Sequence, residues 1–265
     1  MSRWASSPLG TSASIFFAAI RSGTPVALIA TPRTALKCWR KSGWRRIESD
    51  PELADFDQIP LTSRDGLSIE AVFVRGTGLV DLQEGMFMAS DAPLISFLES
   101  ADQQRFRFLL DDRSISGLAT LSDIQKLPVY SVLFGLVIAV EMLLIDWIRK
   151  TCGPNQNAWL DHLNKTQKGS VERHWRDASE RNLAIDRLSC ASFGQEIQAA
   201  QGLGLFKGTE THHERLKSLE ALRHQICHAA EIALTPERAL TIPNDVRNAH
   251  AMASWLQAQI EELQA

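Results

Sequence analysis

The chain has 265 residues, of which 45% are hydrophobic and 22% are charged. This length and apolar content fit one large domain or two small ones with a packed core, and they exclude a collagen, a disulfide scaffold and a wholly disordered chain. The formal net charge of -3 hides an asymmetry, because residues 1–47 contain eight Lys and Arg residues and no Asp or Glu. Such a division is typical of a basic arm attached to an acidic body.

The four cysteines, at positions 38, 152, 190 and 227, are widely spaced and include no C-x-x-C pair. This spacing argues against a disulfide framework or a thiolate zinc site and favours a reducing, cytoplasmic setting. The apolar runs 15–20 and 26–30 are short and are separated by Arg21, which is unfavourable for a secretory signal. An organelle transit peptide is the alternative for this acid-free start of the chain.

The strongest membrane candidate is the apolar run 129–145. It is nearly long enough to cross a bilayer, but Glu141 lies inside it, and Asp146 and Arg149 follow directly. We therefore interpret it as a buried or dimer-forming helix and expect no membrane association, with a single membrane span as the alternative.

The elements follow in chain order from a polar connector at 48–66, which contains two prolines and ends in glycine. Alternating or β-branched patterns predict three strands. Helical spacing predicts one helix between the first and the second strand and a long helix after the third. These segments are strands at 67–74, 105–110 and 114–121, with a short apolar piece at 85–89, and helices at 94–101 and from 122 to about 150.

The character of the chain changes at 152–155, after which no convincing strand occurs. Helical periodicity recurs at 158–164, 171–185, 192–202, 210–234 and 243–263. The predicted fold class is an α+β N-terminal module of order β-α-β-β-α followed by an all-α helical bundle. The predicted segments are a basic leader (1–47), an α+β module (48–151) and a helical domain (152–265).

The sequence GLATLSDI at 117–124 resembles the motif of CBS domains, which reads Gly, two apolar residues, Thr or Ser, two residues, Asp and an apolar residue. The resemblance implies a CBS-like nucleotide-sensing module in which Thr120, Ser122 and Asp123 contact an adenine nucleotide that acts as a regulatory ligand. The simpler interpretation is that these side chains only cap the following helix. CBS motifs work in pairs, so the motif at 117–124 requires a second motif. This second motif is either a degenerate repeat within 12–80, which would include part of the leader, or the same motif of a second chain.

The segment LEALRHQICHAAE at 219–231 resembles HEPN domains, an all-α family whose ribonucleases carry an Arg, a polar residue and a later His. The resemblance implies a catalytic set of Arg223, His224 and His228. We assign His228 as the acid/base, Arg223 as the phosphate stabiliser and His224 as a positioning group, because imidazole titrates near neutral pH and guanidinium clamps phosphate.

Five residues of an ideal helix rotate by about 140°, so Arg223 and His228 do not share a helix face. A single site then requires a helix irregularity or, as the resemblance implies, two protomers of a homodimer. The alternative is that the two histidines are solvated or support a carboxylate network. No H-E-x-x-H order or third characteristic ligand occurs, so we expect no metal site and no required cofactor.

The segment 36–46 places five cations beside two tryptophans, an arrangement that suits contact with a nucleic-acid backbone and its bases. The candidate RNA-binding residues are Lys37, Trp39, Arg40, Lys41, Trp44, Arg45 and Arg46. The alternative is a solvated helix face that the two tryptophans pack.

These observations predict a nucleotide-regulated, metal-independent endoribonuclease that acts on RNA as a homodimer. By analogy with the two families, the expected setting is a toxin or anti-phage defence system. The alternative is a non-catalytic regulatory or interaction module with a protein partner. The absence of a Walker loop and of G-x-G-x-x-G argues against a nucleotide hydrolase or dehydrogenase.

Overall fold

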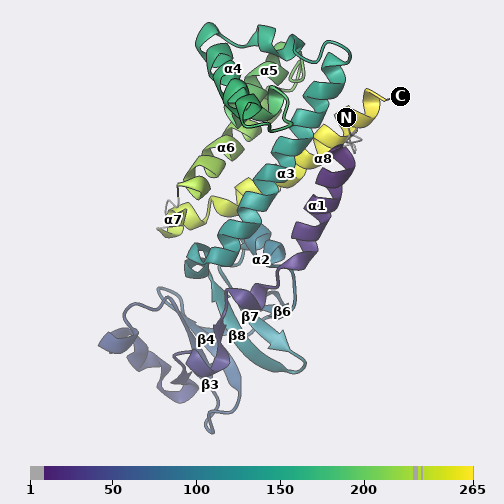
Figure 1. Ribbon diagram of the computed structural model, residues 1–265. Helices are drawn as coiled ribbons and strands as arrows, with labels where there is room; N and C mark the ends of the chain where they lie inside the picture. Colours follow the sequence, from purple (N-terminus) through teal and green to yellow (C-terminus); the bar gives the residue numbers. More distant parts are fainter. Residues whose placement is uncertain (1–8, 229–231, 234, 265) are drawn as a thin grey trace. The chain divides into compact units, whose positions relative to one another are not determined.

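The structure is a computed structural model that describes residues 9–228, 232–233 and 235–264, and it is a mixed α+β protein (Figure 1). The chain divides into two compact units. The helical unit combines residues up to Arg21 with Tyr130–Ile232 and the chain from Asn244 onward, and the β unit combines Ser22–Val129 with Ala233–Pro243. The boundaries thus differ from those expected at 47/48 and 151/152. The basic leader contributes to both units, and the chain from Tyr130 onward, which was expected to end the 48–151 module, belongs to the helical unit.

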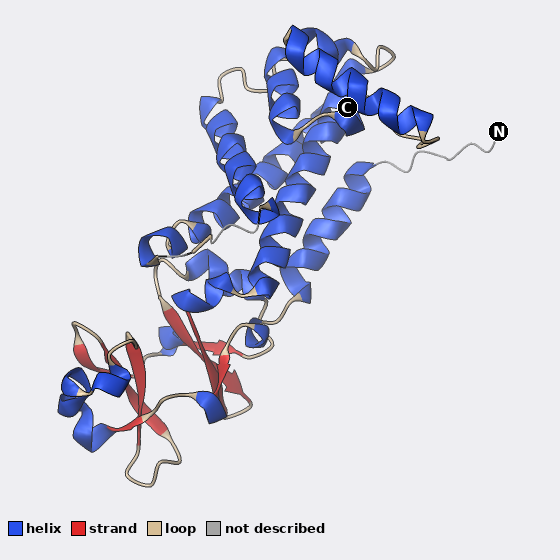
Figure 2. Ribbon diagram, turned by 60° about the vertical axis from the view of Figure 1, so that its left-hand side comes forward, coloured by secondary structure: helices blue, strands red, loops and turns tan. Residues whose placement is uncertain are grey.

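The β unit contains two four-stranded sheets, drawn in red in Figure 2. The first has the order β1-β8-β7-β6, with β6 parallel to β7 and β7 antiparallel to β8. Its elements are β1 (Thr31–Pro32), β6 (Phe87–Ala89), α2 (Leu94–Ser100), β7 (Phe106–Asp111) and β8 (Ser114–Thr120). Helix α2 connects the parallel pair, so the β-α-β-β order expected from the sequence is present.

The second sheet repeats this order in the preceding part of the chain. Strand β2 is parallel to β3, and β3 is antiparallel to β4, with β5 at the other edge. Its elements are β2 (Trp39–Arg40), the 3-10 helices η3 (Lys41–Ser49) and η4 (Pro51–Leu53), β3 (Gln58–Thr62), β4 (Ile69–Val74) and β5 (Gly78–Asp81). Both sheets thus contain a parallel pair joined by a helical connection and followed by an antiparallel hairpin.

Strand β3 lies in the segment expected to be a connector. Ile59 and Leu61 are fully buried, and the strand lies between β2 and β4. Strand β2 pairs only with Leu61 and Thr62, so no β2 residue lies opposite Pro60, which has no N–H to donate. The two prolines and the surrounding polar residues are typical of a connector, so the sequence pattern did not predict this strand.

The two sheets share an apolar core inside the β unit. Ile69 and Val72 of β4 pack in one cluster with Phe106 and Phe108 of β7 and with Leu118 of β8. A second cluster lies beneath η3 and joins Ile47, Leu53, Ile59, Leu61, Ala71 and Phe73. Because one core holds both sheets, the β unit is a single body built from two similar halves.

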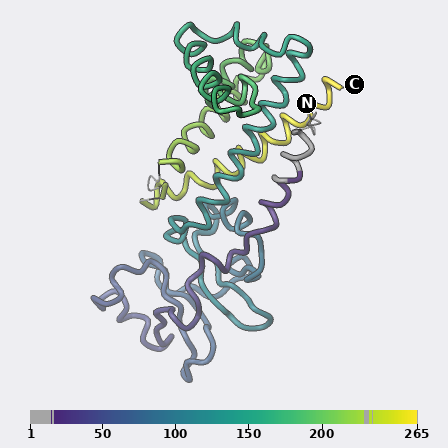
Figure 3. Tube along the Cα trace, viewed as in Figure 1, coloured from purple at the N-terminus to yellow at the C-terminus, as the bar shows by residue number. Residues whose placement is uncertain are grey.

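The helical unit is formed by segments from both ends and the middle of the chain, traced by colour in Figure 3. Two of its helices begin with capping boxes, at Asn164 with Gln167 and at Ser192 with Gln195, which satisfy the first free N–H groups. Its elements are α1 (Leu9–Gly23), α3 (Leu127–Cys152), η7 (Ala158–His162), α4 (Lys165–Glu180), η8 (Leu188–Cys190), α5 (Phe193–Gly202), α6 (Glu210–Cys227) and α8 (Ile242–Glu262).

Helix α6 ends earlier than the sequence predicts. The helix expected at 210–234 stops at Cys227, and His228 follows with φ -94° and ψ 14°. The short α7 (Pro236–Ala239) then belongs to the β unit. Thr235 in extended backbone and Pro236 at the first helical position start this new helix.

Helix α3 is the one described helix that is long and apolar enough to cross a membrane. In the structure, 61% of its most apolar window is buried. Its two carboxylates at 141 and 146 are also buried, and Asp146 Oδ2 lies 3.1 Å from Lys150 Nζ. This packing agrees with the interpretation of 129–145 as a buried helix.

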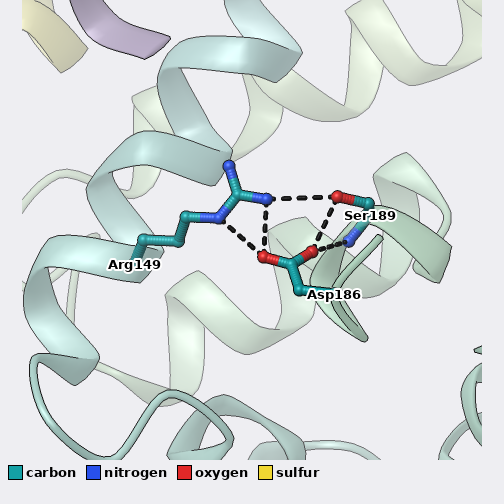
Figure 4. Close-up of polar contacts among 3 residues, drawn as sticks. All are labelled: Arg149, Asp186 and Ser189. Carbon is teal, nitrogen blue, oxygen red and sulfur yellow. Dashed lines mark hydrogen bonds and ion pairs between the residues drawn. The ribbon is translucent and has the colours of Figure 1, made fainter. Parts of the chain in front are cut away.

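The C-terminal end of α3 is tied to the loop that follows α4 (Figure 4). The Arg149 guanidinium donates to Asp186 Oδ2 from Nε at 3.0 Å and from Nη2 at 2.7 Å, and Nη2 also donates to Ser189 Oγ at 3.1 Å. Although burial raises the pKa of Asp186, hydrogen bonds from Ser189 and the charge of Arg149 hold it below its usual value. The paired carboxylate thus fixes this loop against α3.

Candidate functional site

A cavity of about 470 Å³ in the β unit lies where the two sheets face each other. The last residue of β8, Thr120, and the first residues of the 3-10 helix η6 (Leu121–Gln125), Leu121 and Ser122, line it, and the second sheet contributes residues of β3 and β4. Five charged side chains also line it, namely Lys37, Asp55, Asp57, Arg75 and Arg105. We call this cavity the inter-sheet pocket.

Thr120, Ser122 and Asp123 lie close together but have different surroundings. Thr120 and Ser122 line the inter-sheet pocket, and their hydroxyls are 2.8 Å apart. Asp123 is only 5% exposed; its Oδ2 accepts from the Thr120 N–H at 2.7 Å and from the Thr120 hydroxyl at 3.0 Å. Its Oδ1 lies 2.6 Å from Lys126 Nζ, which also donates to the Ile29 carbonyl. The Asp123 carboxylate therefore caps η6 (Leu121–Gln125) and is engaged on both oxygens.

Gly117, the first residue of the CBS-like motif, has a packing role. It lies on β8 opposite Pro32 of β1, and an added Cβ would stand 2.9 Å from the Thr31 carbonyl oxygen. Because the obstructing atom belongs to the backbone, only glycine allows β1 to approach this closely.

Sequence analysis assigned none of the three pocket cations to a nucleotide site: it assigned Lys37 to RNA binding and did not single out Arg75 or Arg105. The Arg75 guanidinium donates to the Leu53 carbonyl at 2.7 Å and to the Phe56 carbonyl, so it holds the η4 region to β4. Lys37 and Arg105 are exposed. No motif signals these positions, because they come from separate elements that only the fold brings together.

A groove of about 610 Å³ lies in the helical unit between α5 and α6. Its lining includes all three residues of the HEPN-like motif. The other lining residues are Ser192, Phe193, Gly194, Lys217, Glu220, Ala221, Gln225 and Cys227. We call it the α6 groove.

Arg223 extends toward the helical core. Its Nε lies 3.2 Å from Oε2 of Glu141, a buried carboxylate on α3. Burial raises the pKa of Glu141, and Arg223 opposes this shift. Glu141 within the apolar run was a signal for this pair, because a buried charge requires a partner.

A second buried carboxylate, Glu196 on α5, interacts electrostatically with the pair formed by Arg223 and Glu141 and is 1% exposed. Burial, followed by repulsion from Glu141, raises the pKa of Glu196 well above its usual value, and Arg223 and Arg149 oppose the shift. The sequence analysis missed this residue, since its position on α5 carries no motif.

His224 and His228 are both exposed, and their ring centroids lie 4.3 Å apart. Cys227, also exposed, lies between them in the sequence. The structure thus brings the two imidazoles together and places Arg223 at the edge of the same groove within one chain, although its guanidinium is paired with Glu141.

The basic segment 36–46 forms β2 and most of η3 and is part of the second sheet. Trp39 and Trp44 pack on the core cluster beneath η3, and the Trp44 ring lies 6.5 Å from that of Phe73. The cationic side chains of Lys37, Arg40, Arg45 and Arg46 are exposed, and Lys41 lies 3.9 Å from Asp81. The structure gives the tryptophans a packing role and leaves the cations at the surface.

Within the residues that the structure describes, no group of three or more His, Cys, Asp or Glu side chains is arranged to hold a metal ion. Comparisons with protein-family models, with curated proteins and with solved structures find no match to this chain.

Proposed function

We propose that the β unit is a pair of CBS-like repeats that binds an adenine nucleotide in the inter-sheet pocket. The observation that carries this proposal is the repeated β-α-β-β order around one pocket, which Thr120 at the end of β8 and Ser122 in the following η6 both line. The second repeat is supplied by the same chain, in the degenerate copy that contains β2, β3 and β4.

The pocket offers hydrogen-bonding and charged groups suited to a nucleotide. The Thr120 and Ser122 hydroxyls can bind ribose hydroxyls, and Asp55 and Asp57 can accept hydrogen bonds from ribose or base. Lys37 and Arg105 supply positive charge for phosphate. Because Asp123 is engaged in the cap, we assign the ribose contacts to the two hydroxyls and not to this carboxylate.

Calorimetric titration with AMP, ADP and ATP tests this proposal. We expect Ser122→Ala to weaken binding by about fivefold to tenfold, the value of one hydrogen bond. Ser114→Ala is the matched control, since Ser114 is an exposed serine at the other end of β8 and its hydroxyl donates to the Asp111 carbonyl. If none of the three nucleotides binds the wild-type protein, the proposal is wrong.

A second function, metal-independent endoribonuclease activity, is favoured by the arrangement of the α6 groove. Two exposed imidazoles with ring centroids 4.3 Å apart can act as a base and an acid on one substrate, so in this proposal His224, expected from the sequence to be a positioning group, shares the proton transfers with His228. One accepts the proton of the ribose 2′-hydroxyl as its oxygen attacks phosphorus, and the other donates a proton to the departing 5′-oxygen. The products are a 2′,3′-cyclic phosphate and a 5′-hydroxyl. The positive charge comes from Arg223, whose guanidinium also pairs with Glu141, or from Lys217, which pairs with Glu220; both residues line the groove.

RNA cleavage in the presence of EDTA tests the second function. We expect His228→Ala to lower the rate by about 100-fold or more, as loss of a general acid or base does. His174→Ala is the matched control, because His174 is an exposed helical histidine on α4 outside the groove. Unchanged stability of both variants, checked by thermal unfolding, assigns the loss to chemistry.

The combination of both functions is the nucleotide-regulated endoribonuclease expected from the sequence, acting as a homodimer in a toxin or defence system. The competing proposal is a non-catalytic module that binds a protein partner. Wild-type protein that binds a nucleotide but leaves varied RNA intact, with and without that nucleotide, would support the non-catalytic module.

A further inference from the structure

The segment Ala233–Pro243 occupies an unusual place in the chain. It belongs to the β unit, yet it joins α6 and α8, which both belong to the helical unit. Figure 3 draws α6 in green and α8 in yellow; between them, residues 229–231 and 234 lie outside the described part of the chain. The chain that carries the paired histidines therefore continues directly into the β unit, and Thr235 follows His228 by seven positions.

This segment forms part of the wall of the inter-sheet pocket. Four of its residues line the pocket, namely Ala233, Thr235, Pro236 and Ala239. Thr120 and Ser122 line the same pocket. Helix α7 packs on η6, the 3-10 helix that Thr120 and Asp123 cap. Ala239 is 1% exposed and Ala233 is 7% exposed, so the two small side chains are held against the β unit.

A weak charge interaction also connects α7 with a residue that lines the pocket. Hydrogen bonds from its own backbone N–H and from Thr235, together with the charge of Arg105, hold the pKa of Glu237 below its usual value. Arg105 also lines the pocket. Glu237 is fully exposed, so this attraction is weak, and the packing of α7 on η6 dominates its docking.

We propose that α7 is the element through which an occupant of the inter-sheet pocket controls the histidine-bearing end of α6. This inference rests on nucleotide binding in that pocket. A ligand that contacts both Ser122 and Thr235 needs α7 docked on η6, so it binds the docked state in preference to the undocked state. Docked α7 then fixes the path of the chain seven residues after His228 and orders the end of α6.

Hydrogen exchange followed by mass spectrometry tests the proposal on the full-length chain. With AMP or ATP at about ten times its Kd, amides of 235–243 and 224–228 are expected to exchange up to about tenfold more slowly, because only the docked state binds. Amides in α4, which is remote in sequence from α7, serve as the internal reference.

A pair of proline variants provides the matched control. Pro236 and Pro51 both stand exposed at the first position of a short helix, each after a residue whose side chain caps that helix. Pro236→Gly favours the undocked segment by about twofold to fivefold, because glycine gains backbone freedom. We expect exchange at 224–228 to be faster by that factor in saturating nucleotide, whereas Pro51→Gly leaves it at the wild-type rate.

The outcomes separate this inference from the function on which it rests. If a nucleotide binds and protects the β unit but not 224–228, coupling through α7 is wrong and nucleotide binding stands. If Pro51→Gly and Pro236→Gly change exchange at 224–228 equally, the effect is not specific to α7 and the inference is also wrong. If no nucleotide binds, both proposals fall together.

Discussion

Glu196 shows how one buried side chain sets a pH dependence. Because burial raises its pKa above the usual 4.5, the folded state retains a proton that the unfolded state loses. As pH rises from that value toward the raised folded pKa, the unfolded state is favoured, so this carboxyl progressively lowers the free energy of unfolding.

We therefore expect Glu196→Gln to increase the free energy of unfolding relative to wild type, and the difference to grow from about pH 5 upward. Urea unfolding followed by tryptophan fluorescence across this range measures it. Glu180→Gln, at an exposed position at the end of α4, is the control and should show no such growth. A constant difference between Glu196→Gln and wild type across the range would contradict the assignment.

Gly117 shows that a motif residue can be explained by packing alone. Gly117→Ala places a methyl group 2.9 Å from the Thr31 carbonyl and should lower stability by about 1–3 kcal/mol. Gly85→Ala adds the same atom where nothing lies within 4 Å and should change stability by less than about 0.5 kcal/mol. Chemical denaturation of both variants checks this, and equal effects would argue against the close approach of β1 to β8.

At the scale of elements, the basic segment 36–46 has two kinds of side chain: its tryptophans pack on the core, and its cations are mostly exposed. Trp44→Ala should cost about 2–3 kcal/mol, less than a fully buried aromatic, because the ring is half-buried on the core beneath η3. Arg40→Ala with Arg46→Ala should leave stability unchanged, since both side chains are exposed.

If these two arginines contact RNA phosphates, the double variant should lower the salt slope of binding to single-stranded RNA by about 1.4. Arg173→Ala with Arg176→Ala, exposed on α4, is the matched control. Filter binding at several salt concentrations measures the slope, and equal slopes in all three proteins would remove the segment from the RNA surface. Removal of 1–47 is less informative, because it deletes α1, β1 and β2.

At the scale of the whole molecule, the two units are interleaved along the chain. Helix α3 is continuous with the β unit, but Glu141 and Arg149 pair with Arg223 and Asp186, which come after position 152. A cut at the sequence boundary between 151 and 152 therefore separates α3 from its partners.

We expect fragment 152–265 alone to lack a cooperative thermal transition, because it is missing the most apolar helix of its unit. Circular dichroism of fragments 1–151 and 152–265, alone and mixed, tests this expectation. Recovery of a cooperative transition on mixing is the expected result. Independent folding of 152–265 would show instead that α3 is dispensable for the helical unit.

The local pattern of the sequence determined strand β4, the order of elements from β6 to α3 and the helical character of the chain after 156, but not strand β5, which the sequence analysis did not expect. Hydrophobic periodicity and turn residues are local, so they report a strand or helix without knowledge of its partners. The cap formed by Thr120 and Asp123 and the proximity of His224 to His228 also follow from short spacing along the chain.

Only the tertiary structure decided the placement of the leader, the presence of β3 and the pairing of Arg223 with Glu141. These features depend on residues far apart in sequence: β2 pairs with β3 across η3 and η4, and Glu141 and Arg223 lie on different helices. The inter-sheet pocket is the clearest case, because its walls come from β8, from the repeat that precedes it and from α7. A local sequence pattern does not predict such contacts, because burial and charge pairing arise only when segments that are distant in the sequence meet in the folded protein.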